Sequence, residues 1–128
     1  MRKAQQTRSL VAAWFDFLSP AEMPVAQAIH KTIRATVPDL TETIRQGNLL
    51  LSMNGEPLLA LAPATDEVKL LIFNGCDIES ALGPLEGVGR RQRMVRFASG
   101  RPVDVVQVEM IASASAGVAR AHQLANGA

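Results

Sequence analysis

The dipeptide Asn54-Gly55 limits the fold of this chain more than any other feature of its sequence. Both residues tolerate a positive φ, and the pair is typical of the two-residue turn that joins antiparallel strands. From Leu49 to Met53, apolar side chains recur at every second position, which is the period of a strand with one buried face. We therefore predict a β-hairpin here, with its first strand within residues 41–53.

Three more strands are predicted from similar patterns. The returning strand of the hairpin is expected over residues 57–62, a third strand over residues 68–73 and a fourth over residues 92–98. The third is almost continuously apolar, which favours a central strand buried on both faces, although a short buried helix would show the same pattern. Within the first strand, Gly47 is expected to mark a β-bulge.

Helical patterns surround these strands. Apolar side chains three and four residues apart predict a helix over residues 4–18 and a second over residues 20–37, for which Ser19 is the expected N-cap. One or two helical turns are expected over residues 77–82. A final helix is expected over residues 103–125, where a run of small residues would let it approach the sheet closely.

The fold class predicted from these elements is α+β, with an antiparallel sheet of about four to five strands and two N-terminal helices and one C-terminal helix packed on it. Trp14, Phe15 and Phe17 provide three of the five aromatic residues and are interpreted as core side chains of the first helix. A length of 128 residues suits one domain, and no repeat or linker divides it, so residues 1–128 are expected to form a single unit.

Composition excludes several classes of partner. Thirteen basic and 12 acidic residues leave a net charge of +1, so the chain has no overall attraction to nucleic acid or membrane. Aromatic residues for base stacking are scarce, and no apolar stretch approaches the ~18 residues of a membrane span. Cys76 is the only cysteine, which suits a reducing, cytoplasmic setting. The start of the chain is a poor signal peptide, while an amphipathic leader remains an alternative.

The segment Gly83–Arg101 is the strongest local motif, because several glycines are followed by arginines and only Glu86 opposes them. Glycine backbone can present N–H groups to an anion, and arginine binds carboxylate or phosphate through two hydrogen bonds. We predict that it recognises a small anionic ligand or an acidic protein through Gly87, Gly89, Arg90, Arg91, Arg93 and Arg96. The alternative is that the glycines only turn the chain and the arginines line the solvated side of an edge strand.

Residues suited to metal binding or catalysis are scattered. His30, Cys76 and His122 have no spacing typical of a metal site, and His30 is interpreted as a packed, hydrogen-bonded side chain. Cys76 is expected to be a small buried residue, with a reactive thiol as the alternative. Glu42 could act as a general base, but a salt bridge or a backbone cap is the simpler role. No catalytic residue and no metal ligand is predicted.

An ordered set of short motifs resembles one known family. It comprises Pro38–Ile44, Gly47, Asn54–Leu58, Val68–Leu70, Phe73–Gly75, Leu85–Gly89 and Arg90–Arg96. Together these segments resemble the YdhG-like domain, a domain of unknown function, over about residues 15–122. The motif positions that the resemblance singles out are Glu42, Gly47, Gly75 and Glu86.

The resemblance implies an α+β fold with a helix-covered antiparallel sheet, and a homodimer. One bacillar member is described as a frataxin-like iron chaperone, so iron is implied by resemblance alone. The family often has an aromatic residue before the glycine and a proline soon after it, whereas this chain has Gln46-Gly47-Asn48-Leu49. The function predicted is an intracellular binding or carrier protein. The alternatives are an iron chaperone and an uncharacterised enzyme that uses Cys76 or Glu42.

Overall fold

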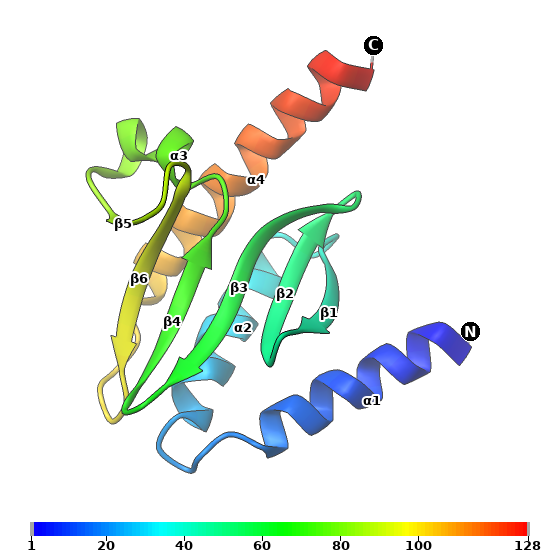
Figure 1. Ribbon diagram of the computed structural model, residues 1–128, viewed down its shortest axis with the longest axis vertical. Helices are drawn as coiled ribbons and strands as arrows, with labels where there is room; N and C mark the ends of the chain where they lie inside the picture. The colour runs from blue at the N-terminus through cyan, green and yellow to red at the C-terminus, as the bar shows by residue number, and fades with distance from the viewer. Residues whose placement is uncertain (1, 128) are drawn as a thin grey trace.

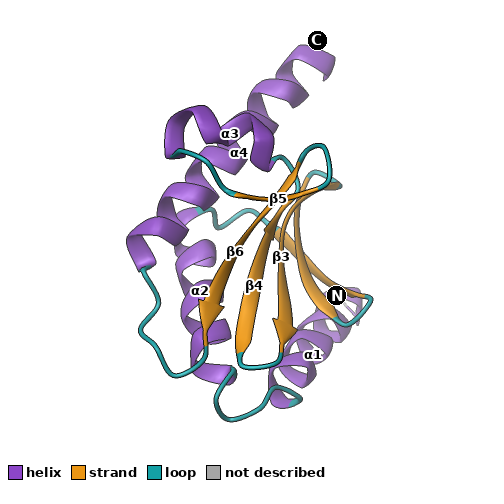
Figure 2. Ribbon diagram, turned by 60° about the vertical axis from the view of Figure 1, so that its left-hand side comes forward, coloured by secondary structure: helices purple, strands orange, loops and turns teal. Residues whose placement is uncertain are grey.

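A curved antiparallel sheet with helices against one face forms the framework of the molecule (Figures 1 and 2). The computed structural model describes residues 2–127, with side chains described for residues 9–87 and 89–126. The strand order is β1-β2-β3-β4-β6-β5. The strands are β1 Thr41–Arg45, β2 Asn48–Met53, β3 Glu56–Ala64, β4 Glu67–Ile72, β5 Glu86–Val88 and β6 Gln92–Ala98. The helices are α1 Arg2–Asp16, α2 Met23–Thr36, α3 Gly75–Leu82 and α4 Val105–Gly127.

The predicted first strand is a hairpin of two strands. β1 and β2 are joined by Gln46 and Gly47, which both have positive φ, of 53° and 79°. Arg45 pairs directly with Asn48 across this turn. The prediction of a bulge at Gly47 is therefore wrong, because the glycine reverses the chain instead of adding an extra residue to one strand.

The hairpin predicted at Asn54-Gly55 is confirmed. Both residues have positive φ, of 50° and 84°, and they join β2 to β3. The register between these strands shifts between Leu51 and Ser52, beside Pro57. Proline has no N–H to donate to a ladder, so an irregular position is where a sheet tolerates it.

β4 is central in the sheet, as predicted, but only one of its faces is fully buried. Val68, Leu70 and Ile72 are buried, whereas Lys69 and Leu71 between them are half-buried. The prediction of burial on both faces is wrong, because α2 and α4 pack against one face while the opposite face is hollowed. Leu71, an apolar residue at a half-buried position, made the end of the sequence pattern look continuous.

β6 has the predicted bounds, and β5 lies beyond it. β5 is a three-residue strand inside a segment that was expected to be only a loop. β5 pairs with β6 only at Gln92–Met94, so Arg93 lies on an inner strand, whereas Arg96 lies where β6 still forms the edge of the sheet, as the alternative interpretation of the arginines expects. Six strands replace the expected four to five, since one predicted strand is two and β5 is added.

The two N-terminal helices differ from their predictions mainly at their ends. α1 ends at Asp16, and Phe17 after it is 89% exposed, so the expected core role of Phe17 is wrong. α2 begins at Met23, although Ser19 and Glu22 form the reciprocal side-chain-to-backbone hydrogen bonds of a capping box one turn earlier. The prediction of Ser19 as the N-cap is therefore wrong, because a turn over residues 20–22 separates Ser19 from the helix and the N-cap is Glu22.

α4 lies close to its neighbours through its small residues. Ala112, Ala116 and Ala119 are fully buried. Between them, Ser115 Oγ donates a 2.7 Å hydrogen bond to Asn74 Oδ1, and Asn74 Nδ2 donates to the Ser115 carbonyl. This buried polar pair ties the start of α3 to the middle of α4. The close approach predicted for the C-terminal helix is confirmed.

Candidate functional site

The arginines of the Gly83–Arg101 segment are paired with carboxylates. Arg91 Nη2 lies 2.8 Å from Asp77 Oδ2, and Arg93 Nε lies 3.1 Å from Glu79 Oε1. Both carboxylates belong to α3, which packs against β6. The expectation that only Glu86 opposes these arginines is wrong, because the fold brings further acids to them from outside the segment.

Arg96 bridges two strands through Glu67 of β4 and Glu86 of β5, each at 2.9 Å. The hydrogen bonds that Arg96 donates to Glu86 and, second, to Glu67 raise the pKa of Arg96. The same bond from Arg96 lowers the pKa of Glu86 despite the opposing effect of partial burial. These exposed ion pairs connect neighbouring strands along one face of the sheet.

Most of the positive charge in this segment is therefore offset by four carboxylates, on α3, β4 and β5. Arg90 is exposed and forms no ion pair among the side chains that the structure describes. Anion binding by Gly87, Gly89, Arg90, Arg91, Arg93 and Arg96 stays a prediction. Any anion would have to compete with the ion pairs for three of these four arginines.

A cavity of about 340 Å³ lies on the sheet face opposite the core. Because side chains alternate along a strand, residues between the core positions of β2, β3 and β4 point to this face. Its floor is apolar and consists of Leu50, Ala60, Leu71 and Phe73, with Pro57 beside them. Its polar lining consists of Arg45, Gln46, Asn48 and Gln92.

Ala60 lies between two leucines on the floor of the cavity. Leu50 and Ala60 are almost inaccessible although they lie on the hollowed face, and they pair directly across β2 and β3. Leu71 pairs with Ala60 from the other side. An alanine between two leucines leaves an apolar depression, which can take the hydrophobic part of a small molecule.

Arg45 supplies the cation of this cavity. It ends β1, is exposed, and forms no ion pair within the described side chains. No acidic residue lines the cavity with it. A guanidinium without a carboxylate partner, beside an apolar floor, suits a carboxylate, sulfonate or phosphate group. The sequence pointed to Gly83–Arg101 instead, and only Gln92 of that segment reaches the cavity.

Glu42 is held by α2 at the other face of the sheet. Its Oε2 lies 2.7 Å from His30 Nε2, and its Oε1 lies 3.5 Å from Arg34 Nε. Burial raises the pKa of Glu42, but the hydrogen bond from His30 and the charges of His30 and Arg34 outweigh it, so the pKa is lowered overall. His30 also packs edge-on against Phe15. The interpretation of His30 as a packed, hydrogen-bonded residue is confirmed.

The other motif positions of the resemblance have structural roles. Gly47 forms the first hairpin turn, and its carbonyl accepts a 2.8 Å hydrogen bond from the Trp14 indole. Gly75 lies against Arg93, where a Cβ atom would come within 2.9 Å of the backbone nitrogen. Glu86 pairs with Arg96. Each of these positions is explained by packing or pairing.

Residues considered for metal binding or catalysis do not converge. Cys76 is half-buried in the first turn of α3, near Asp77, so its expected burial in the core is wrong. His122 lies on α4, with Asn126 and Glu56 as neighbours. Within the described residues, no three side chains of histidine, cysteine, aspartate or glutamate form a group that could hold a metal ion. The iron-chaperone and enzyme hypotheses stay predictions.

Comparisons with known proteins bear on the fold alone. No family model and no curated protein matches the chain. A crystal structure of a DUF1801-family protein, YdhG from Bacillus subtilis, matches with a TM-score of 0.61 and 11% identity, over 78% of this chain and 82% of that one. The fold implied by the resemblance is therefore confirmed. Within residues 2–127, none of the helices has the length and hydropathy to cross a bilayer.

Proposed function

We propose that this protein binds a small molecule with an apolar body and one anionic group, and that it acts by binding and not by catalysis. The observation that carries the proposal is the cavity of about 340 Å³ on the hollowed face of the sheet. Its volume lies in the range of natural ligand sites, which combine mostly apolar walls with a few polar groups.

The two halves of the proposed ligand correspond to two parts of the cavity. The apolar body lies over the half-buried Leu71 and Phe73, beside the almost inaccessible Leu50 and Ala60, and burial of the ligand's own apolar surface supplies most of the binding free energy. The anionic group lies at Arg45, which can offer two parallel N–H donors. The amides of Gln46, Asn48 and Gln92 provide further donors and acceptors at the rim.

The proposal keeps the class of ligand predicted from the sequence and changes the residue that binds its charge. Arg91, Arg93 and Arg96 already hold carboxylates, whereas Arg45 holds none within the described side chains. An anion at Arg45 therefore displaces water and breaks no ion pair. A binding or carrier role is consistent with an open cavity that exchanges its ligand with solvent.

Two fluorescent probes test the proposal, because they share an aromatic body and differ in charge. 1-Anilinonaphthalene-8-sulfonate carries a sulfonate, and N-phenyl-1-naphthylamine does not. We expect both to bind in fluorescence titrations. Ala60→Leu fills the floor and should weaken both probes about tenfold or more. Arg45→Gln should weaken the sulfonate probe about tenfold and leave the neutral probe unchanged.

Matched control variants lie close to the cavity. Ala62→Leu adds the same volume on the same strand and face but outside the lining, and Arg90→Gln removes an exposed arginine elsewhere. Neither should change binding of either probe. If Ala60→Leu binds both probes as the wild type does, while its urea midpoint is also unchanged, the cavity is not the site and the proposal is wrong.

A further inference from the structure

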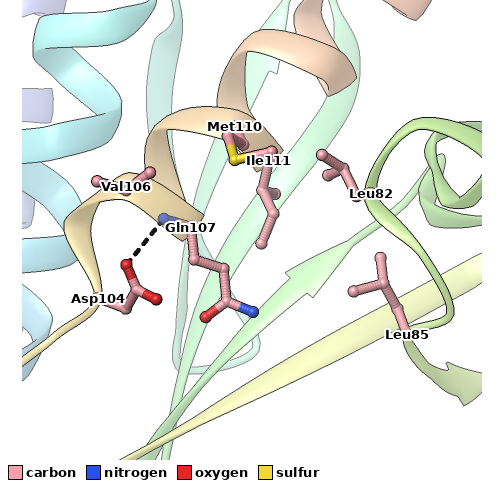
Figure 3. Close-up of a pocket in the computed structure, with 7 residues that line it drawn as sticks. All are labelled: Leu82, Leu85, Asp104, Val106, Gln107, Met110 and Ile111. Atoms are coloured by element: carbon pink, nitrogen blue, oxygen red, sulfur yellow. Dashed lines mark hydrogen bonds between the residues drawn. The ribbon is translucent and has the colours of Figure 1, made fainter.

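A second cavity, of about 230 Å³, lies beside the first turns of α4 (Figure 3). Its walls come from the beginning of α4 and from the connection that leads from α3 to β5. The space is called here the α4 cavity, and its lining residues are Leu82, Leu85, Asp104, Val106, Gln107, Met110 and Ile111. It shares no lining residue with the cavity of the sheet, so a ligand in one does not occupy the other.

Apolar side chains make up most of the α4 cavity. Leu82 and Leu85 are half-buried, whereas Val106 and Met110 of α4 are 59% and 49% exposed, and Ile111 is buried. Exposed apolar surface of this kind gains free energy when a ligand covers it. The volume lies below the range of sites for drug-sized ligands, so the α4 cavity suits a compact apolar body such as a single ring.

Asp104 supplies the carboxylate of the α4 cavity. Its Oδ1 accepts a 3.1 Å hydrogen bond from the backbone nitrogen of Gln107, which caps the first turn of α4. Its Oδ2 accepts no hydrogen bond from the residues that the structure describes, and the carboxylate forms no ion pair with them. One carboxylate oxygen is therefore available to a ligand while the other holds the helix cap.

Gln107 provides a second polar group. Its amide extends across the α4 cavity between Asp104 and Leu85, and it forms no side-chain hydrogen bond within the described part of the chain (Figure 3). The amide oxygen can accept a hydrogen bond on the same side as Asp104 Oδ2. No lysine, arginine or histidine is among the described residues that line this cavity. Two acceptors, one of them charged, and no cation suit a ligand group that is positively charged and donates several hydrogen bonds.

We propose that the α4 cavity binds a small organic amine, which is a protonated amino group on a compact apolar body. The ammonium group donates to Asp104 Oδ2 and to the amide oxygen of Gln107, and the apolar body covers Val106 and Met110. The charge preference is opposite to that of Arg45 in the cavity of the sheet. This site is therefore additional to the proposed function and does not depend on it.

Nitrogen–proton correlation NMR of the full chain tests the proposal with 2-phenylethylamine and 2-phenylethanol. The two probes have the same apolar body, and only the amine is charged at pH 7. We expect both to shift the amide signals of Leu85, Gln107 and Ile111, with the amine bound about fivefold more tightly. The signals of Leu50 and Ala60 report the cavity of the sheet separately. Equal affinities, or no saturable shift by ~10 mM amine, would overturn the proposal.

A change of charge at position 104 isolates the role of the carboxylate. Asp104→Asn removes the charge and retains the cap, because asparagine is as good an N-cap as aspartate. It should weaken the amine about fivefold and leave the alcohol unchanged. Glu109→Gln is the matched control, because Glu109 is an exposed acidic residue of α4 outside the lining, and it should change neither affinity.

Filling the space tests the location. Val106→Trp should weaken both probes about tenfold, whereas Val105→Trp, at an exposed neighbour outside the lining, should not. Circular dichroism should show that all four variants are folded, since none of the replaced side chains belongs to the core. If Asp104→Asn binds the amine as tightly as the wild type does, or if Val106→Trp leaves both affinities unchanged, the α4 cavity is not an amine site.

Discussion

The carboxylate of Glu42 is held in its charged form by two side chains of α2. His30 Nε2 donates a hydrogen bond of 2.7 Å to Glu42 Oε2, and Arg34 Nε lies 3.5 Å from the other oxygen, Oε1. Together they lower the pKa of Glu42 from its ordinary value of 4.5, against the effect of burial. A carboxyl group with a lower pKa in the folded state stabilises the fold above its unfolded pKa and loses that contribution as the pH falls.

We therefore expect Glu42→Gln to destabilise the protein at pH 7 by roughly 1.5–3 kcal/mol, the usual scale for a hydrogen bond to a charged group. The difference from wild type should shrink as the pH falls through and below 4.5, because the wild-type carboxyl group also becomes neutral there. Urea unfolding from pH 7 to pH 3 measures it. Asp16→Asn, on an exposed residue, is the control. A difference that stays constant with pH would contradict this account.

The partners of the arginines and the role of Arg45 could not be predicted from the sequence. The segment from Gly83 to Arg101 shows its arginines but not Asp77, Glu79 or Glu67, which reach them only after α3 and β4 pack beside β6. Arg45 had no distinguishing pattern around it, because its place in the cavity depends on the turn at Gln46. Ion pairs between distant segments depend on the fold, so the spacing of residues along the chain does not predict them.

The contact between α3 and β6 depends on one glycine. A side chain at position 75 would meet the Cβ and Cγ atoms of Arg93 and come within 2.9 Å of its backbone nitrogen. The backbone nitrogen cannot move without moving β6, so the helix would have to shift. Overpacking of this kind costs roughly 1–3 kcal/mol.

We accordingly expect Gly75→Ala to lower the free energy of unfolding by roughly 1–3 kcal/mol in urea denaturation. Gly87→Ala is the matched control, because a Cβ there meets nothing within 4 Å and the residue lies on β5 close by. The control should change stability by no more than about 0.5 kcal/mol, as exposed substitutions usually do. Equal effects at the two positions would show that close packing is not the reason for the glycine.

The helices, strands and turns with common sequence patterns were the ones that could be predicted. Asn54-Gly55 identified its hairpin, and β6 was found with its observed bounds. The turn at Gln46-Gly47 was missed because glutamine seldom adopts a positive φ, so the glycine was interpreted as a bulge. β5 is only three residues long and holds its place through pairing with β6, which no periodicity within three residues can indicate.

Across the whole molecule, one cluster of buried side chains connects the helices to the sheet. It includes Trp14 of α1, Ile29 of α2, Leu61 of β3 and Ile111 of α4. A domain with one continuous core usually unfolds in a single step. Trp14 is the only tryptophan and the chain has no tyrosine, so its fluorescence reports one place, the contact of α1 with the β1–β2 turn.

We expect the urea transitions followed by Trp14 fluorescence and by far-ultraviolet circular dichroism to coincide at a fixed protein concentration. The first measures the docking of α1, and the second measures the helices and strands of the entire chain. Trp14→Phe removes the bond to the Gly47 carbonyl and should move the dichroism midpoint to lower urea. An earlier fluorescence transition would mean that α1 detaches before the sheet unfolds.

The fold class was predictable at this scale because hydrophobic periods of two and of three to four residues separate sheet from helix along the chain. The placement of the helices on the two faces of the sheet was less predictable. A continuous apolar pattern in β4 suggested helices on both faces, whereas the structure has α2 and α4 on one face and a hollow on the other. The sequence pattern alone does not distinguish an apolar sheet face that helices cover from one that is open.

Packing α2 and α4 on a single side gives the molecule a front and a back (Figure 2). A small molecule would therefore reach the hollow from the uncovered side without any helix having to move.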